Sequence, residues 1–130
     1  MSDYSMLING EAATAEHAIE VINPATETVI ATVPEASLAQ LDEAVAAARS
    51  ALPDWSARSM DDRRALILKI ADRLEENIGE LAQLLSEEQG KPIEGFAGLG
   101  AMFELGGSLA WIRYTASLDL PIEVIQDNDE

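Results

Sequence analysis

Few residues in this sequence can do chemistry, and none stands in a spacing that defines a complete site. There is no cysteine, so the chain has no thiol nucleophile, no thiolate metal ligand and no disulfide. His17 is the only histidine, and its polar surroundings before a β-branched segment favour a solvated side chain over a ligand. Gly98-Leu99-Gly100 is not a dinucleotide fingerprint, because the third glycine of that pattern would fall at Phe103 and no strand precedes it.

Glu104 is the only charged residue between Ala101 and Ile112. A carboxylate that is buried in an apolar stretch needs a charged or hydrogen-bonding partner, or its pKa rises. Arg113 lies about two and a half helical turns further on, which puts it on the opposite face of a helix. We therefore expect any partner of Glu104 to come from another element.

The element that carries Glu104 is predicted to be a central core helix over residues 101–118. A helix with two apolar rows must be covered on two sides. Gly106 and Gly107 each destabilise a helix interior by roughly 1 kcal/mol relative to alanine, so we expect another backbone to approach closely there. The two rows recur at three- and four-residue steps and comprise Met102, Leu105, Leu109, Ile112 and Ala116 in one, and Phe103, Gly107, Ala110 and Tyr114 in the other.

A membrane span is the alternative for this apolar stretch. Arg113 and Asp119 shorten the apolar run well below the roughly 20 residues that a bilayer requires. No cluster of Lys and Arg flanks it either. We therefore expect no membrane partner.

A helix is predicted after Ser37, which can form a capping box with Gln40. Pro53 is expected to end this helix. One face carries the apolar residues Leu38, Leu41, Val45, Ala48 and Leu52.

A second helical segment begins at the cap formed by residues 59–62 and extends to Gln89. Residues 77–80 can recap or kink it. Gly90 is suited to the left-handed position after a helix, and Pro92 prevents continuation. Three glycines between Ile93 and Gly100 then predict a loop.

The predicted strands lie at the two ends of the chain. Residues 6–8, 19–22 and 28–33 are apolar or β-branched, and turns are expected at Asn9-Gly10 and at residues 23–26. We predict an N-terminal β-meander over 1–34, a helical core over 37–118, and a strand at 122–125 within a final 121–130 segment that ends in acidic residues. The fold class is α/β and α-rich, and it looks like the opening of a larger α/β structure.

Composition limits the classes of partner. With 130 residues the chain is long enough for one domain with a sizeable core. It has 24 acidic and 8 basic residues, for a formal net charge of -16, which argues against nucleic acid and anionic membranes as partners. No basic and apolar signal follows Met1-Ser2-Asp3, so a cytoplasmic location is expected.

Ordered motifs along nearly the whole chain resemble the N-terminal segment of the NAD(P)-dependent aldehyde dehydrogenase superfamily. Beyond the N-terminal strands, the resemblance includes Trp55 and extends to Asp119-Leu120-Pro121. The other matching runs are Leu7-Ile8-Asn9-Gly10-Glu11, Ile22-Asn23-Pro24-Ala25-Thr26, 29–34, 44–49, 70–77, Glu88-Gln89-Gly90-Lys91-Pro92 and Arg113-Tyr114.

The resemblance implies a partial aldehyde dehydrogenase fold rather than a complete enzyme. In the family a cysteine attacks the aldehyde, hydride passes to the nicotinamide, and water hydrolyses the acyl enzyme. This chain lacks the cysteine, the Trp-Asn-Phe-Pro segment of the oxyanion hole and the strand-helix unit that holds the dinucleotide. We therefore assign it no catalytic and no cofactor-binding residue, and NAD or NADP is expected only in the complete enzyme.

The resemblance also suggests one metal site. Some family members bind a monovalent cation through the backbone at the position of Val21 and an acidic residue at the position of Glu88, with another ligand from later in the chain. Oxygen ligands suit such a cation.

A second likeness is to the family's general-base motif, which Glu104-Leu105-Gly106-Gly107-Ser108 resembles. Ser108 replaces the motif's lysine and the run lies far upstream, so we interpret the likeness as coincidence. The chain is about one helical turn longer than the family between Pro92 and Glu104, so no substrate-channel residue is carried over.

Two functional hypotheses follow. In the first, the chain is an N-terminal fragment or truncated relative of an aldehyde dehydrogenase and does not act alone. In the second, it is an interaction module that docks on a dehydrogenase subunit or on itself, because exposed apolar helix faces and an edge strand seek partners. An unrelated helical bundle would require the ordered motifs to be accidental. The aldehyde and the choice between NAD and NADP are encoded beyond Glu130 in the family.

Overall fold

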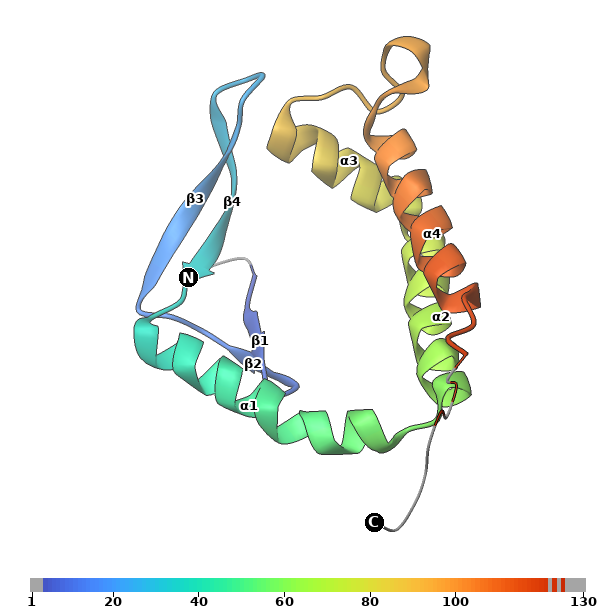
Figure 1. Cartoon of the computed structure of the whole chain (residues 1–130). Helices are drawn as coiled ribbons and strands as arrows, with labels where there is room; N and C mark the ends of the chain where they lie inside the picture. Colours follow the sequence, from blue (N-terminus) through green and yellow to red (C-terminus); the bar gives the residue numbers. More distant parts are fainter. Residues whose placement is uncertain (1–3, 122, 124, 126–130) are drawn as a thin grey trace.

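A computed structural model describes residues 4–121, 123 and 125. Within them, four short strands are followed by helices (Figure 1). The elements are β1 (Met6–Ile8), β2 (Glu11–Ala13), β3 (His17–Asn23), β4 (Thr28–Glu35), α1 (Leu38–Ala57), α2 (Met60–Glu76), α3 (Ile78–Gln89), the 3₁₀ turn η1 (Phe96–Gly98) and α4 (Ala101–Ser117).

The first hairpin joins β1 and β2 through the predicted two-residue turn. Asn9 and Gly10 have φ values of 53° and 80°, and Ile8 pairs with Glu11, as a type I′ turn requires. This turn prediction is confirmed. The strand β2 was not predicted, because Glu11–Ala13 carries no β-branched or aromatic residue.

The second hairpin joins β3 and β4. The amide N–H of Glu27 donates to the Asn23 carbonyl at 2.8 Å, and the Ala25 amide donates to the Asn23 side chain at 2.9 Å, which confirms the predicted turn. The predicted single meander is divided into two two-stranded sheets in the described residues. The reason is that β2 folds back onto β1, so β3 begins a separate antiparallel pair.

The helix α1 begins where the capping box was predicted. The Gln40 amide donates to the Ser37 hydroxyl at 3.2 Å, and the Ser37 amide donates to the Gln40 side chain at 3.0 Å. The predicted end at Pro53 is wrong, because α1 continues to Ala57. A proline inside a helix removes one backbone hydrogen bond and crowds the carbonyl four residues earlier, but its φ is helical, so the chain can continue for one more turn.

Asn77 separates α2 from α3, as the predicted recap or kink requires. Its φ of -110° and ψ of 13° leave the helical region, and its side-chain amide donates to the Arg73 carbonyl at 2.7 Å. The predicted caps at both ends of this segment are confirmed. The Asp62 amide donates to the Ser59 hydroxyl at 3.0 Å, and Gly90 ends α3 with a φ of 69°.

The core lies where α4 packs against α2 and α3 (Figure 1). Its buried residues are mostly alanines, which allow helices to approach closely; they are Ala71, Ala82, Ala101, Leu109 and Ala116. The prediction that α4 is covered on two sides is not met by the described residues. Phe103, Trp111 and Tyr114 are exposed, and no atom lies within 4 Å of a Cβ built at Gly106 or Gly107. The described chain supplies no element to pack on this face.

The described chain forms an open frame, with the hairpins and α1 on one side and α2, α3 and α4 on the other (Figure 1). The two sides meet at the α1–α2 junction and where α3 packs against β3. None of the described helices is both long and apolar enough to cross a membrane. The strand predicted at 122–125 lies partly outside the described residues, and the acidic end at 127–130 lies wholly outside them.

Candidate functional site

The residues of the predicted cation site lie on two elements that contact each other. Val21 is half-buried in β3, and Glu88 is exposed in the last turn of α3. These elements pack together, and a Cβ built at Gly90 would lie 2.7 Å from Cγ of Pro24 in the hairpin turn. The described residues hold no group of three or more His, Cys, Asp or Glu side chains able to bind a metal ion. The cation site therefore stays a prediction.

Glu104 forms an ion pair with Lys91, which confirms that its partner comes from another element. Lys91 follows the end of α3, and its side chain is only 21% exposed. The same segment holds the start of α4, because the Ala101 and Met102 amides donate to the carbonyls of Pro92 and Ile93 at 3.0 and 2.9 Å. The arrangement gives Glu104 a structural contact that joins α4 to the preceding loop.

His17 is exposed at the start of β3, as a solvated side chain would be. It lies opposite Glu35 in the hairpin, beside a polar cavity of about 460 Å³ at the N-terminal end of α1. Across this cavity the Gln40 side chain donates to the Thr14 carbonyl at 2.8 Å, so the residues there join the hairpins to α1.

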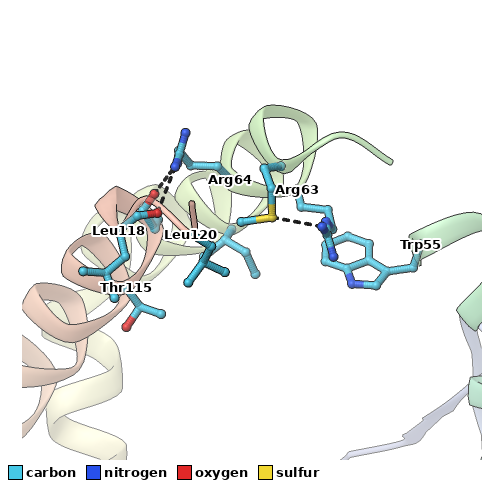
Figure 2. A pocket seen from close by; sticks show the side chains of 9 residues that line it. Trp55, Arg63, Arg64, Thr115, Leu118 and Leu120 are labelled. Atoms are coloured by element: carbon cyan, nitrogen blue, oxygen red, sulfur yellow. Dashed lines mark hydrogen bonds between the residues drawn. The ribbon is translucent and has the colours of Figure 1, made fainter. Parts of the chain in front are cut away.

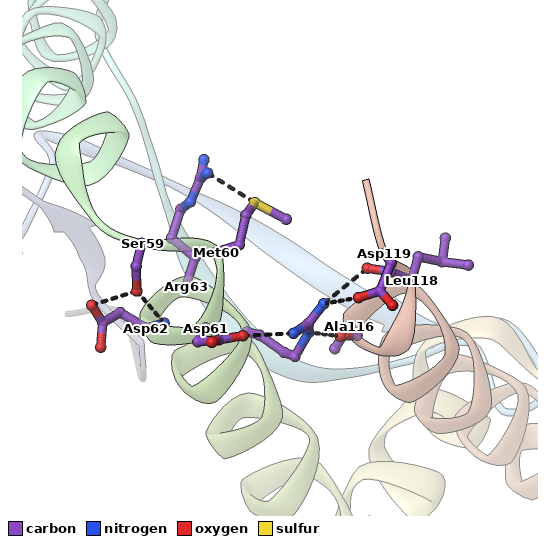
Figure 3. A network of polar contacts seen from close by, with 9 residues as sticks. Ser59, Met60, Asp61, Asp62, Arg63, Ala116, Leu118 and Asp119 are labelled. Carbon is purple, nitrogen blue, oxygen red and sulfur yellow. Dashed lines mark hydrogen bonds and ion pairs between the residues drawn. The ribbon is translucent and has the colours of Figure 1, made fainter. Parts of the chain in front are cut away.

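Arg64 holds the end of α4 against α2, a role that sequence reasoning missed. Figure 3 shows its acceptors Ala116, Leu118 and Asp119 at the end of α4, with Asp61 on α2 facing them. Its guanidinium donates to the carbonyls of Ala116 and Leu118, the latter at 3.0 Å. It also pairs with Asp61 at 2.7 Å and Asp119 at 3.3 Å. These contacts satisfy carbonyls that have no partner within the helix. The only sequence signal was an arginine on the apolar side of a predicted helix.

Arg113 makes a second contact between the same two helices. Its guanidinium lies 2.6 Å from the Glu75 carboxylate and 3.7 Å from that of Asp72. The hydrogen bond from Arg113, and then its charge, lower the pKa of Glu75 below its ordinary value. The same pair raises the pKa of Arg113. The partners are 38 residues apart in the chain, which no local pattern reveals.

The apolar stripe predicted along one face of α1 is largely exposed in the described structure. Leu38, Leu41 and Leu52 are 82%, 55% and 59% exposed. The helix approaches the first hairpin with its alanine face, and Ala44, Ala47, Ala48 and Ala51 lie across a cavity from β1 and its turn. The described residues therefore leave the bulkier side chains of α1 without cover.

The outward face of α4 is the most aromatic part of this exposed surface. Trp111 is 71% exposed and Tyr114 is 56% exposed, with their ring centroids 5.8 Å apart. Large exposed apolar patches mark interaction surfaces, and tryptophan and tyrosine are enriched in such interfaces. The described residues thus leave an aromatic surface of α4 exposed.

Solved structures with this fold define the class of the protein. It superposes on lactaldehyde dehydrogenase from Escherichia coli with a TM-score of 0.85 and 30% identity, over 98% of this chain and 26% of that one. An NAD⁺ complex of aldehyde dehydrogenase from Bacillus cereus gives a TM-score of 0.80 and 38% identity, over 87% and 23%. The fold is therefore part of the aldehyde dehydrogenase fold.

The aldehyde dehydrogenase family model matches residues 11–122, and the chain belongs to that family. It is 36% identical over 122 residues to the aldehyde dehydrogenase LUC3 of Fusarium sp, covering 94% of this chain and 25% of that protein. It is 41% identical over 115 residues to a mitochondrial aldehyde dehydrogenase of Leishmania tarentolae, covering 87% and 22%. The chain spans about a quarter of the length of these relatives, and its resemblance to an N-terminal segment is confirmed.

Proposed function

We propose that this chain serves as the N-terminal part of an enzyme that oxidises an aldehyde to a carboxylate with NAD or NADP. Family membership and the span of a quarter of the relatives support this proposal. The absence of cysteine from the 130 residues means that the nucleophile of the family's reaction must come from elsewhere. The chain alone is a scaffold without catalytic activity.

The observation that carries the proposal is the uncovered face of α4. Trp111 and Tyr114 are exposed there, and Gly106 and Gly107 leave room for a backbone to approach. A helix with two apolar rows is stable against water only when both rows are packed. In the proposed enzyme, elements outside these 130 residues cover this face.

The assay that tests the proposal measures NADH or NADPH formation by the purified chain with a panel of aldehydes. We expect no turnover and no tight binding of either dinucleotide, because the chain has no cysteine and no dinucleotide unit. A purified aldehyde dehydrogenase serves as the positive control. Measurable turnover by the cysteine-free chain would refute the proposal.

A second function is a stand-alone interaction module that binds itself or a dehydrogenase subunit. The exposed apolar residues on α1 and α4 favour it, whereas the formal charge of -16 opposes association of identical chains. Sedimentation velocity at low and high salt shows whether apolar attraction or charge repulsion between identical chains prevails. A monomer at high concentration in both salts would count against self-association. The cytoplasmic location expected from the sequence stays a prediction.

The complete enzyme would also allow the cation site to be tested. We propose that the Val21 carbonyl and the Glu88 carboxylate supply two of its ligands. Potassium should then raise the thermal midpoint of the complete enzyme more than lithium does, and the replacement Glu88→Gln should reduce this difference. An unchanged potassium effect would remove Glu88 from the site.

A further inference from the structure

An apolar cavity of about 340 Å³ lies where the end of α1 meets the start of α2 and the end of α4 (Figure 2). The side chains that line it include Trp55 near the end of α1, Ile67 in α2 and Leu120, which follows the end of α4. Its volume lies at the lower end of the range of small-molecule sites, which are mostly apolar with a few polar groups.

Arg63 places a cationic group in the wall of this cavity (Figure 2). Its Nε atom is buried and has no hydrogen-bond partner in the described structure. Another nitrogen of the guanidinium contacts the thioether of Met60 at 2.9 Å, and thioether sulfur is a weak acceptor. A buried donor without a partner destabilises a protein, so a ligand that accepts from Arg63 would be favoured here.

None of the described carboxylates forms an ion pair with Arg63, although the chain has 24 acidic residues. The neighbouring Arg64 also lines the cavity, but its guanidinium is fully engaged by the end of α4 and by Asp61. Among the described basic residues, Arg63 alone is partly buried and makes no ion pair that the structure shows. The other described basic residues without such a pair, Arg49, Arg58 and Lys69, are exposed.

We propose that this cavity binds a small monocarboxylate with an apolar chain. The carboxylate accepts hydrogen bonds from the Arg63 guanidinium, whose planar donors match a carboxylate. The apolar chain lies against Trp55 and Ile67, where it leaves water. A phosphate or another dianion fits less well, because one free guanidinium in a strongly acidic protein cannot balance two negative charges.

Trp55 provides a direct probe for this binding. The chain has two tryptophans, and Trp111→Phe leaves Trp55 as the only one. We expect octanoate to change the fluorescence of this variant with saturation. Octanol, which has the same apolar chain without the charge, should bind at least tenfold more weakly. Equilibrium dialysis with labelled octanoate gives the stoichiometry independently, and we expect one site per chain.

Further substitutions in the Trp111→Phe chain distinguish the contribution of the Arg63 charge to octanoate binding from that of the apolar cavity. We expect Arg63→Met to weaken octanoate binding at least tenfold while it leaves octanol binding unchanged, and Arg63→Lys to restore part of the loss. Arg73→Met is the matched control, since that side chain is 81% exposed on the same helix, and it should leave the affinity unchanged.

Three results would overturn the proposal. The first is no saturable binding by fluorescence or dialysis at millimolar octanoate. The second is equal affinity for octanoate and octanol, which would show an apolar contact without carboxylate recognition. The third is unchanged octanoate affinity in Arg63→Met. Octanol binding by Arg63→Met reports that the cavity is still formed, so a loss of octanoate binding alone is attributable to the guanidinium.

Discussion

At the scale of residues, two arginines hold α4 against α2. Arg64 donates to carbonyls at the end of α4, and Arg113 of α4 pairs with Glu75 near the end of α2. The two differ in burial, because the Arg64 side chain is 26% exposed and that of Arg113 is 43% exposed. Their removal should therefore have different consequences.

Replacing Arg64 should destabilise the fold more than replacing an exposed arginine. We expect Arg64→Ala to lower the free energy of unfolding by about 2–3 kcal/mol, because it leaves helix-end carbonyls without donors. Arg73→Ala removes only a surface pair with Glu76 and should cost less than about 1 kcal/mol. Urea unfolding followed by circular dichroism measures both. Equal losses would contradict the assigned role of Arg64.

The pair of Glu75 and Arg113 should make stability depend on pH. Because the pKa of Glu75 is lowered in the folded state, its contribution is present above the ordinary carboxyl pKa and is lost as pH falls through the lowered value. In Glu75→Gln, the fall of the thermal midpoint on acidification should be smaller. Glu43→Gln, at an exposed position on α1, is the control. Parallel pH curves for wild type and Glu75→Gln would contradict this account.

At the scale of elements, the junctions between elements are formed by residues with special backbone geometry. The helices contact each other mainly through small side chains. Gly90 has a φ of 69° and lies against Pro24, so it ends α3 and also allows the second hairpin to approach. Ala71, Ala82 and Ala116 are the buried residues at which α2, α3 and α4 meet. Most of the buried residues at the described helix contacts are thus small, with Leu109 as the larger exception.

Two glycine substitutions test this view of the joints. We expect Gly90→Ala to lower the free energy of unfolding by at least about 1 kcal/mol, because alanine resists a positive φ and its Cβ would meet Pro24. Gly79→Ala should instead raise it by about 0.5 kcal/mol, since that position is helical and nothing lies within 4 Å of the added Cβ. Thermal unfolding compares the two. Stabilisation by Gly90→Ala would refute the role given to this joint.

The sequence predicted those features that depend on local chemistry. The turn at Asn9-Gly10, the caps at Ser37 and Ser59 and the end of α3 at Gly90 each follow from residues a few positions apart. Pro53 misled the prediction, because a proline signal cannot show whether the next turn still forms.

Features that depend on tertiary contacts could not be read in this way. The α1 stripe was correctly recognised as apolar, but periodicity does not say which element covers a face. The contacts of Arg64 with the end of α4 join residues more than fifty positions apart. The prediction for Glu104 was only that its partner comes from another element, and it did not identify Lys91. The two predicted cation ligands remain untested, since their third partner belongs to a later part of the family's chain.

At the scale of the whole molecule, the described residues form an open frame with much apolar surface. The second row of α4 and the stripe of α1 are both exposed, although each has the pattern of a buried helix face. The match to about a quarter of the length of known aldehyde dehydrogenases gives this surface a physical explanation. We infer that further elements of such an enzyme pack against it.

The measurement that tests this account most directly is the mass of the native polypeptide. Antibodies raised against the 130-residue chain would capture it from its source, and intact mass spectrometry would determine its size. We predict a species several-fold heavier than 14.0 kDa, which would join these residues to the rest of a dehydrogenase. A species at 14.0 kDa alone would contradict the account and would favour the stand-alone interaction module.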